Sequence, residues 1–281
     1  MSTDRFIIRP MTLADLELVI QWEATEGWNP GLNDAIPFYS ADPSGFLIGE
    51  IDGTPISSIS AVRYGDSFAF IGIYIVQPAW RGQGYGLQTW NAALKLLGDR
   101  PTALDAVLQQ VNNYIKFGFK PTYHHLRYQG TGQSGVIPEG IVWLRDIPFA
   151  DVVSYDNLYF PASRRNFLKN WIDRPEHKAY GMLQDGKLCG YGVIRPCYTG
   201  FKIGPLFANS TEIAESLFLA LITHAENQPV FIDVPNINTL AIALVESRKM
   251  VPIFECVRMY THDLPNIEIN HIFGVTTLEL G

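Results

Sequence analysis

Three glycines with an arginine ahead of them follow an apolar run in the N-terminal half of the chain. The run ends at Val76-Gln77-Pro78, and Arg81-Gly82-Gln83-Gly84-Tyr85-Gly86 then places glycine at every second position. Glycine lets a backbone approach a ligand closely, and the free N–H groups at the start of a helix attract anions. The spacing therefore predicts a phosphate site between a strand and a helix, with Arg81 adding positive charge.

Three kinds of phosphate loop and a plain turn compete for this segment. A Walker loop needs Gly-Lys followed by Ser or Thr, whereas Leu87 and Gln88 follow Gly86 here. The nicotinamide dinucleotide loop of an oxidoreductase reads G-x-G-x-x-G at the first strand of a domain, whereas this loop reads G-x-G-x-G after several strands. A turn without a ligand explains the glycines but not the arginine or the strand–helix context. The residues match R-x-x-G-x-G instead.

The loop from Arg81 to Gly86 resembles the coenzyme A pyrophosphate motif of the GNAT N-acyltransferase superfamily. The segment NYIKFGF, residues 113–119, is similar to the Tyr-x-x-x-Gly-Phe ending of that family. With EGWNPGLNDA at 26–35, the N-terminal half resembles a bacterial tandem-GNAT subfamily, in which a divergent second domain follows an ordinary acyltransferase domain. The resemblance covers residues 1 to about 130 well. The second half, including VTTLELG at 275–281, resembles the divergent domain more loosely.

The resemblance implies a mixed α/β fold of two tandem domains, each with a central, mostly antiparallel sheet flanked by helices. We place the catalytic domain at 1–130 and the divergent domain at 141–281, because residues 131–140 are glycine-rich and nearly uncharged, as in a linker. After the predicted strand at 201–207 the second half has no glycine motif. We therefore expect one cofactor site per chain, with the second domain covering the acceptor cleft or an interface.

The implied reaction is acetyl transfer from acetyl-CoA, as cosubstrate, to a primary amine of a small molecule or a peptide. Tyr114 would protonate the departing thiolate, unless it is simply a packed aromatic. The family strand bulges near Tyr74 to Val76, before the loop, where its backbone would donate to the thioester carbonyl. The residues implied to bind the cofactor are Tyr74, Ile75, Val76, Arg81, Gly82, Gln83, Gly84, Tyr85 and Gly86.

The strand that carries a general base in many family members has no acid in this chain, since residues 70–74 read FIGIY. Asp105, on the next predicted strand and flanked by apolar residues, is the nearest substitute. A carboxylate in such a strand needs a structural partner or a function, and both remain open. A chain without a base would be a non-catalytic acyl-CoA-binding sensor or regulatory protein, which is the alternative function.

The segment after the first predicted helix borders the acceptor cleft in the family. Trp28 offers a cation–π face to an amine, although a rigid turn built on this aromatic explains it equally well. Besides Asp105, the residues considered for binding the acceptor are Glu26, Trp28, Asn29, Asp34, Gln109 and Gln110.

Composition argues against several other classes of protein. The net charge is −7 and neither half is basic, so we expect no nucleic-acid partner. The first eleven residues lack the apolar core of a signal peptide, and the longest apolar stretches are too short to cross a bilayer. We therefore expect a cytoplasmic protein without a membrane partner, and leave a homodimer open.

Cysteine and histidine spacing predicts no metal site and no hydrolase triad. Cys189, Cys197 and Cys256 follow no zinc-binding pattern and are expected to be buried, reduced thiols. His124 and His125 are adjacent in sequence, so on a strand their side chains would point to opposite faces and could not share a metal ion.

The proposed site needs strands before the glycines and a helix after them. Asp52-Gly53 and Gly65-Asp66 predict hairpin turns between three strands within residues 46–76. The helix after the glycines is predicted to bury one apolar stripe: Leu87, Trp90, Leu94 and Leu97. A strand at 102–108 and a short helix that ends at Gly118 complete the expected site.

Overall fold

The computed structural model describes residues 5–281. The expectation of no signal peptide rests partly on residues 1–4, which lie outside the described residues. The strands are β1 (Phe6–Pro10), β2 (Phe46–Ile51), β3 (Thr54–Tyr64), β4 (Phe68–Val76), β5 (Thr102–Val107), β6 (Lys120–Thr131), β7 (Ile141–Trp143), β8 (Lys178–Gln184), β9 (Lys187–Pro196), β10 (Phe201–Ala208), β11 (Pro229–Pro235), β12 (Val251–Tyr260) and β13 (Ile272–Gly274). The α-helices are α1 (Leu13–Thr25), α2 (Ala35–Ala41), α3 (Tyr85–Leu97), α4 (Val111–Ile115), α5 (Phe149–Asp156), α6 (Arg165–Asp173), α7 (Thr211–Ile222) and α8 (Thr239–Ser247).

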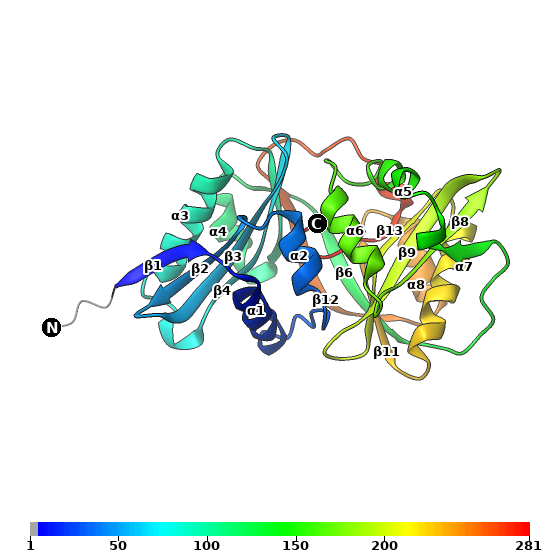
Figure 1. Ribbon diagram of the computed structural model, residues 1–281, viewed down its shortest axis with the longest axis horizontal. Coiled ribbons are helices and arrows are strands. Elements are labelled where there is room, and N and C mark those ends of the chain that lie inside the picture. Colours follow the sequence, from blue (N-terminus) through cyan, green and yellow to red (C-terminus); the bar gives the residue numbers. More distant parts are fainter. Residues whose placement is uncertain (1–4) are drawn as a thin grey trace.

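The strands form one large sheet that runs through both halves of the chain (Figure 1). The order across it is β1-β2-β3-β4-β5-β12-β6-β11-β10-β9-β8-β7, and β13 pairs with β10. Among the named strand pairs of residues 5–281, β4–β5 and β10–β11 are parallel and the others are antiparallel. The mixed α/β class, with a mostly antiparallel sheet flanked by helices, is therefore confirmed.

Strand β12 joins the two halves, because it comes from the second half and lies between β5 and β6 of the first. Cys256 is opposite Val107 on one side and His125 on the other. Residues 125–131 of β6 in turn pair with β11. The sheet is thus continuous past residues 131–140, and the domain boundary placed there remains a prediction.

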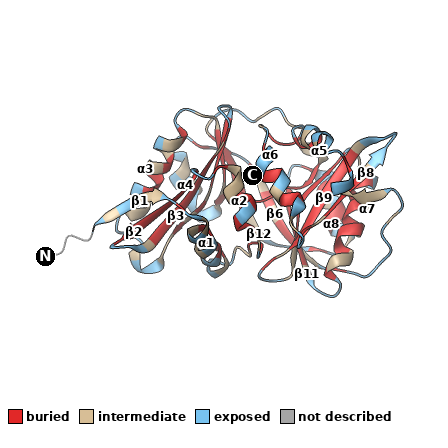
Figure 2. Ribbon diagram, viewed as in Figure 1, coloured by how far each residue is buried: buried red, intermediate tan, exposed pale blue. Residues whose placement is uncertain are grey.

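Helices cover both faces of the N-terminal part of the sheet. Helix α1 begins at a capping box, in which Thr12 and Asp15 bond each other's backbone N–H groups, and it buries Leu16 and Val19. It packs with α2 and α6 against one face, whereas α3 and α4 pack against the other. Figure 2 shows buried residues along the strands between these helices. The core therefore lies on both sides of the sheet.

The apolar stripe predicted on α3 is wrong at its first residue. Trp90 and Leu97 are buried, but Leu87 is 53% exposed. The packed face of α3 consists of Thr89, Trp90, Ala93 and Leu97. Leu87 lies roughly 100° around the helix from the centre of that face, because each residue advances a helix by about 100°.

Residues 275–281 return to the first half of the molecule, and the C label in Figure 1 lies between the two halves. The Tyr64 hydroxyl donates to the Leu280 carbonyl at 2.9 Å, and Arg164 donates to the Gly281 carbonyl at 3.1 Å. A Cβ on Gly72 would lie 2.0 Å from the Glu279 carbonyl oxygen, so this tail crosses β4 where β4 has no side chain. We call residues 275–281 the tail.

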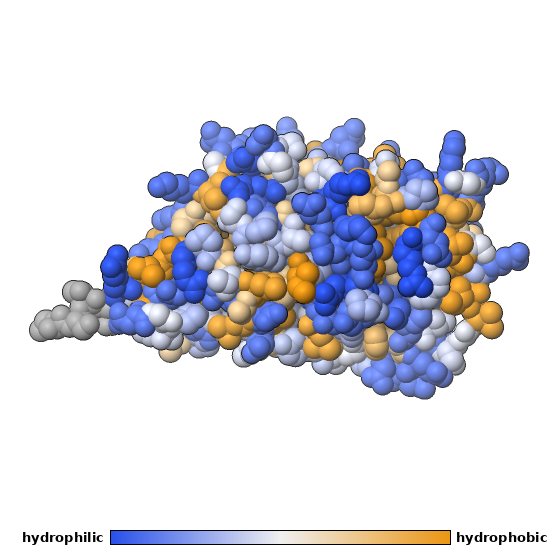
Figure 3. Space-filling view, viewed as in Figure 1, coloured by the Kyte–Doolittle hydropathy of each residue, from blue (hydrophilic) through white to orange (hydrophobic). Residues whose placement is uncertain are grey.

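The surface mixes polar and apolar side chains. In Figure 3 hydrophilic residues are interspersed with hydrophobic groups, which are largest over the end formed by the second half. Within residues 5–281, no helix combines the length and the apolar character needed to cross a membrane.

Candidate active site

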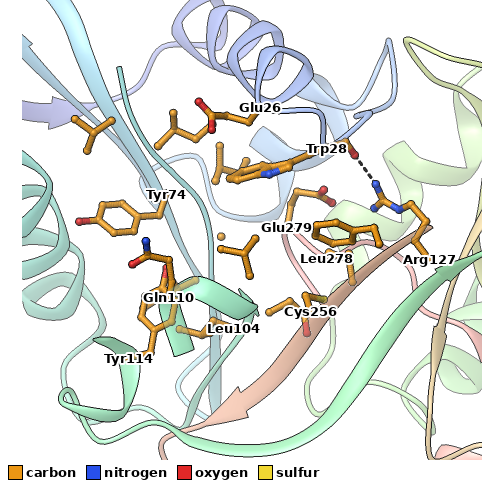
Figure 4. A pocket seen from close by; sticks show the side chains of 18 of the residues that line it. Glu26, Trp28, Tyr74, Leu104, Gln110, Tyr114, Arg127, Cys256, Leu278 and Glu279 are labelled. Carbon is orange, nitrogen blue, oxygen red and sulfur yellow. Dashed lines mark hydrogen bonds between the residues drawn. The ribbon is translucent and has the colours of Figure 1, made fainter. Parts of the chain in front are cut away.

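A cavity opens where β4 and β5 separate. These parallel strands pair at three positions, the last being Ile71 with Leu104, and both strands continue beyond it. A bulge in β4 widens the opening: Ser60 pairs with Gly72 and Ser58 pairs with Ile75, so two residues of β4 face one of β3. The bulge expected at Tyr74 to Val76 thus lies between Gly72 and Ile75. The resulting cavity of about 420 Å³ has the size of a small-ligand site (Figure 4).

The glycine loop leads directly from β4 into α3. Gly84 precedes the first residue of α3 with φ of 85°, a left-handed conformation that glycine adopts without strain. Gly86 packs against β4, since a Cβ there would lie 2.7 Å from the Tyr74 hydroxyl. Of the residues predicted to bind the cofactor, Tyr74, Ile75, Val76 and Arg81 line the cavity, whereas residues 82–86 follow Arg81 and are not part of its wall. The loop thus joins the start of a helix, as the sequence predicts, and its role as an anion site remains a prediction.

Arg81 and Glu26 form an ion pair at the edge of the cavity. Arg81 Nη2 donates to Glu26 Oε1 at 2.5 Å, and Arg81 Nε donates to the Val76 carbonyl at 2.8 Å. The Arg81 side chain is 49% exposed and the Glu26 side chain 28%. The predicted loop cation and the predicted acceptor residue thus meet, and each partly neutralises the other.

Tyr114 lies on the α3 side of the cavity, in a cluster of aromatic rings. Its ring centroid is 5.1 Å from that of Trp90, which is itself 5.6 Å from the Tyr74 ring. Burial raises the pKa of Tyr74 to about 12, and burial together with Tyr74 raises the pKa of Tyr114 further above its ordinary value. Both hydroxyls therefore stay protonated near neutral pH. Gln110 also lines the cavity and accepts a hydrogen bond from Asn113 at 2.7 Å.

Asp105 lines the cavity but has a structural partner. Arg258 donates to its two oxygens through Nε and Nη2, each at 2.8 Å, and His125 Nδ1 lies 3.0 Å from Oδ1. Burial alone would raise the pKa of Asp105, but the charges of Arg258 and His125 outweigh it and hold that pKa well below its usual value. A carboxylate so strongly stabilised in its ionised form is a weak proton acceptor.

Asp105, His125 and Cys256 are the one group of potential metal ligands found in residues 5–281, with one ligand atom of each within 4.8 Å of the others. Arg258 already binds both oxygens of Asp105, so the group has the geometry of an ion pair. His124 bonds Glu255 instead, as its opposite strand face requires. All three cysteines are free and buried, as the sequence predicts.

The loop after α1 is joined to the second half of the chain. Trp28 lines the cavity, and its carbonyl accepts from Arg127 Nη1 at 2.6 Å. Asn29 does not line the cavity, because its side chain bonds the Thr199 backbone at 2.8 and 3.0 Å. The buried pair of Asp34 with Arg195, and the pairing of Gly31 with Cys197, extend this contact. Residues from the second half thus fix the loop that carries Trp28.

Sequence reasoning missed a cavity residue at the end of the first half and those that come from the second half and its tail. They are Arg127 on β6, Phe254 and Cys256 on β12, and Leu278 and Glu279 in the tail. Glu279 is 6% exposed, and no hydrogen-bond partner of its carboxylate is found within residues 5–281. Figure 4 shows this carboxylate between the Trp28 ring and the Arg127 guanidinium. The family-like ending VTTLELG was the sole sequence signal near Glu279, and it gave no position in space.

Comparisons with known proteins agree with this geometry. The model of the acetyltransferase (GNAT) family matches residues 13–119, and that of an acetyltransferase (GNAT) domain matches residues 152–274. Holothin acyltransferase of Pseudoalteromonas sp. (strain SANK 73390) is 30% identical over 275 residues, which cover 97% of this chain and 94% of that protein.

Solved structures share the fold. A putative acetyltransferase from Pyrococcus horikoshii superposes with a TM-score of 0.83 at 24% identity, covering 98% of this chain and 96% of that one. A tandem GNAT protein from the clavulanic acid biosynthesis pathway gives a TM-score of 0.64 at 15% identity, covering 92% and 100%. Together with the two matched domains and the relative of nearly equal length, these likenesses show that the chain belongs to the GNAT acyltransferases, as an enzyme with two such domains in tandem.

Proposed function

We propose that this acyltransferase moves the acetyl group of acetyl-CoA to an amine of a small molecule or a peptide by direct attack. The observation that carries the proposal is the cavity between the separating strands β4 and β5, which adjoins a glycine loop at the start of α3. A glycine loop of the kind that binds phosphate, next to a cavity with a largely apolar wall, suits a long ligand with an anionic end and a thioester end. The similarity to holothin acyltransferase supports acyl transfer as the reaction class.

In the proposed reaction the cofactor binds on the α3 side of the sheet, and the acceptor enters from the opposite side. Gly82 to Gly86 and the N-terminus of α3 would hold the pyrophosphate. The β4 bulge would present backbone N–H groups to the thioester carbonyl. Tyr114, on the same side as α3, would donate a proton or a hydrogen bond to the departing sulfur. The acceptor would enter from the opposite side, past Trp28.

The second half supports one cofactor site per chain. Helix α7 occupies the position that corresponds to α3, but Ser210 caps it by accepting from the Ile213 N–H. A capped helix start without glycines offers fewer free N–H groups to a phosphate. Family membership favours the enzyme over the non-catalytic acyl-CoA sensor that the missing strand acid had left open.

A thermal-shift panel with acetyl-CoA, coenzyme A, NADH and ATP tests the proposal. A ligand at 100 times its Kd stabilises a protein by about 2.7 kcal/mol, which moves a melting curve visibly. We expect a shift with both coenzyme A forms that Gly84→Glu abolishes. Gly53→Glu is the matched control, because Gly53 has φ of 80° and open surroundings, like Gly84.

Release of free thiol in the presence of amines then tests transfer itself. A shift with NADH but not with coenzyme A, or an unchanged coenzyme A shift in Gly84→Glu, would remove the support for the proposed cofactor site. Coenzyme A binding without thiol release from any amine would instead favour the sensor.

A further inference from the structure

The tail occupies the space that a side chain at position 72 of β4 would need. Gly72 is on the bulged strand, and the point where its Cβ would be lies 2.0 Å from the Glu279 carbonyl oxygen and 3.0 Å from the Glu279 Cα. The Glu279 side chain therefore starts beside the bulge, where the cavity opens. β4 has no acid of its own, and Asp105 is held by Arg258.

The Glu279 carboxylate is the one charged group of the cavity wall without an ion-pair partner in the described part of the chain. The other charged wall residues are each paired: Arg81 with Glu26, Asp105 with Arg258, and Arg127 with Asp233. The remaining wall is largely apolar, with Ile73, Leu104, Val107, Phe254 and Leu278 among its residues. The one unpaired charged group of the cavity wall within residues 5–281 is thus a carboxylate, and most of the wall around it is apolar.

The charged groups packed around Glu279 leave its carboxylate available. Arg127 on β6 and Arg195 on β9 are bound by Asp233 and Asp34. Lys202 on β10 has its pKa lowered by burial and by Arg127, and its ammonium lies 3.5 Å from the Trp28 carbonyl. Glu23 on α1 is fully buried, and both its oxygens lack partners within residues 5–281. Burial and repulsion from Glu279 and Asp34 raise the pKa of Glu23, against the opposing effect of Lys202 and Arg195.

We propose that Glu279 is the general base of the acceptor site, and that the acceptor is an amine with an apolar body and no anionic group. The proposal rests on the acyl transfer proposed above. The amine nitrogen bonds to the thioester carbon, the carbon–sulfur bond breaks, and the sulfur leaves with the electron pair. Glu279 accepts the proton lost by nitrogen, and the thiolate receives a proton from Tyr114 or water. The products are an amide and free coenzyme A.

Three variants test the base. Glu279→Gln keeps the shape and removes the charge, Glu279→Asp withdraws the carboxylate by one methylene, and Glu268→Gln is a control because Glu268 is exposed nearby in sequence. We expect Glu279→Gln to lower kcat about 100- to 10,000-fold, as loss of a general base does. Acetyl-CoA binding, followed by thermal shift, should stay near wild type. Glu279→Asp should recover part of the rate, and Glu268→Gln should match wild type.

The pH profile separates a base from a merely structural residue. An alkylamine is mostly protonated near pH 7, as a lysine side chain is. The fraction of free amine rises about tenfold per pH unit below the pKa of the amine. The difference in kcat between wild type and Glu279→Gln should therefore narrow as the pH rises toward 10. A kcat for Glu279→Gln within about threefold of wild type, or a deficit that does not change with pH, overturns the base.

Acceptor binding to the coenzyme A complex needs no turnover, and isothermal titration calorimetry can measure it. Butylamine and γ-aminobutyrate share a chain length, but only the second carries a carboxylate. We expect wild type to bind butylamine at least about tenfold more tightly than γ-aminobutyrate. Glu279→Gln should lose most of this preference. Equal binding of the two ligands, or an unchanged preference in Glu279→Gln, overturns the inference. Acetyl-CoA binding without thiol release would refute the proposed transfer. The binding comparison would still show whether Glu279 selects an acceptor without an anionic group.

Discussion

Replacing Gly72 by alanine would push the tail away from the cavity. The added Cβ would lie 2.0 Å from the Glu279 carbonyl oxygen and 2.8 Å from its carbonyl carbon, whereas ordinary contact begins at 3.4 Å. The obstructing atoms belong to the backbone, so no side-chain rotation relieves the clash. The tail must therefore retreat by about 1.4 Å, or β4 must bend by as much.

The tail cannot retreat without losing contacts. The Tyr64 hydroxyl donates to the Leu280 carbonyl at 2.9 Å, and Arg164 Nη1 donates to the Gly281 carbonyl at 3.1 Å. One lost hydrogen bond costs about 1 kcal/mol, and overpacking a tight site costs about 1–3 kcal/mol. We expect Gly72→Ala to lower the free energy of unfolding by about 2–4 kcal/mol. Because a displacement of about 1 Å can cost about 100-fold in rate, kcat should fall by a similar factor.

Urea unfolding and thiol-release kinetics measure the two effects on the same preparation. Gly135→Ala is the matched control, since a Cβ at Gly135 would meet only Thr223 Cγ2, at 3.7 Å. An unfolding midpoint unchanged by Gly72→Ala would show that the tail does not press on β4. A lower stability with full kcat would show that the position of Glu279 does not matter to the reaction.

Three further substitutions give distinct results. Asp105→Asn leaves Arg258 buried without a counter-charge, so the free energy of unfolding measured in urea at pH 7 should fall by about 3–5 kcal/mol. Because the pKa of Asp105 is depressed in the folded state, its ionised carboxylate stabilises the protein above about pH 4, and this stabilisation is lost as the pH falls further. The variant should not show this loss of stability in acid. Burial lowers the pKa of His177 to about 4, so stability should fall by up to about 3 kcal/mol between pH 6.5 and 4, and His177→Gln should flatten this slope. Tyr114→Phe should lower kcat about 10- to 100-fold without weakening acetyl-CoA binding, and an unchanged kcat would leave Tyr114 a packing residue.

Local patterns predicted the backbone structure around the glycine loop well. Six consecutive residues from Arg81 to Gly86 specify a tight turn and the start of α3, and the structure has both. The hairpin turns at Asp52-Gly53 and Gly65-Asp66 separate β2, β3 and β4 as predicted. These features depend on backbone conformations that a few neighbouring residues determine, so they can be read without knowing the rest of the fold.

The acceptor side depends on contacts between residues far apart in the chain. Asp105 meets Arg258, 153 positions away, and Asn29 bonds Thr199, 170 positions away. Sequence spacing carried no information on which half of the chain would supply these partners. The same reason hid Glu279, whose tail reaches β4 only because β12 first brings the second half into the sheet.

The position of β12 also determines the order in which the molecule can assemble. During synthesis β5 and β6 leave the ribosome long before residues 251–260 exist, an interval on the order of ten seconds at usual translation rates. Until then the facing edges of β5 and β6 lack the strand that separates them, and open edges invite pairing with other chains. Closure between strands so distant in sequence is slow. A nascent chain therefore forms the glycine loop before β12 and the tail can complete the wall of the cavity.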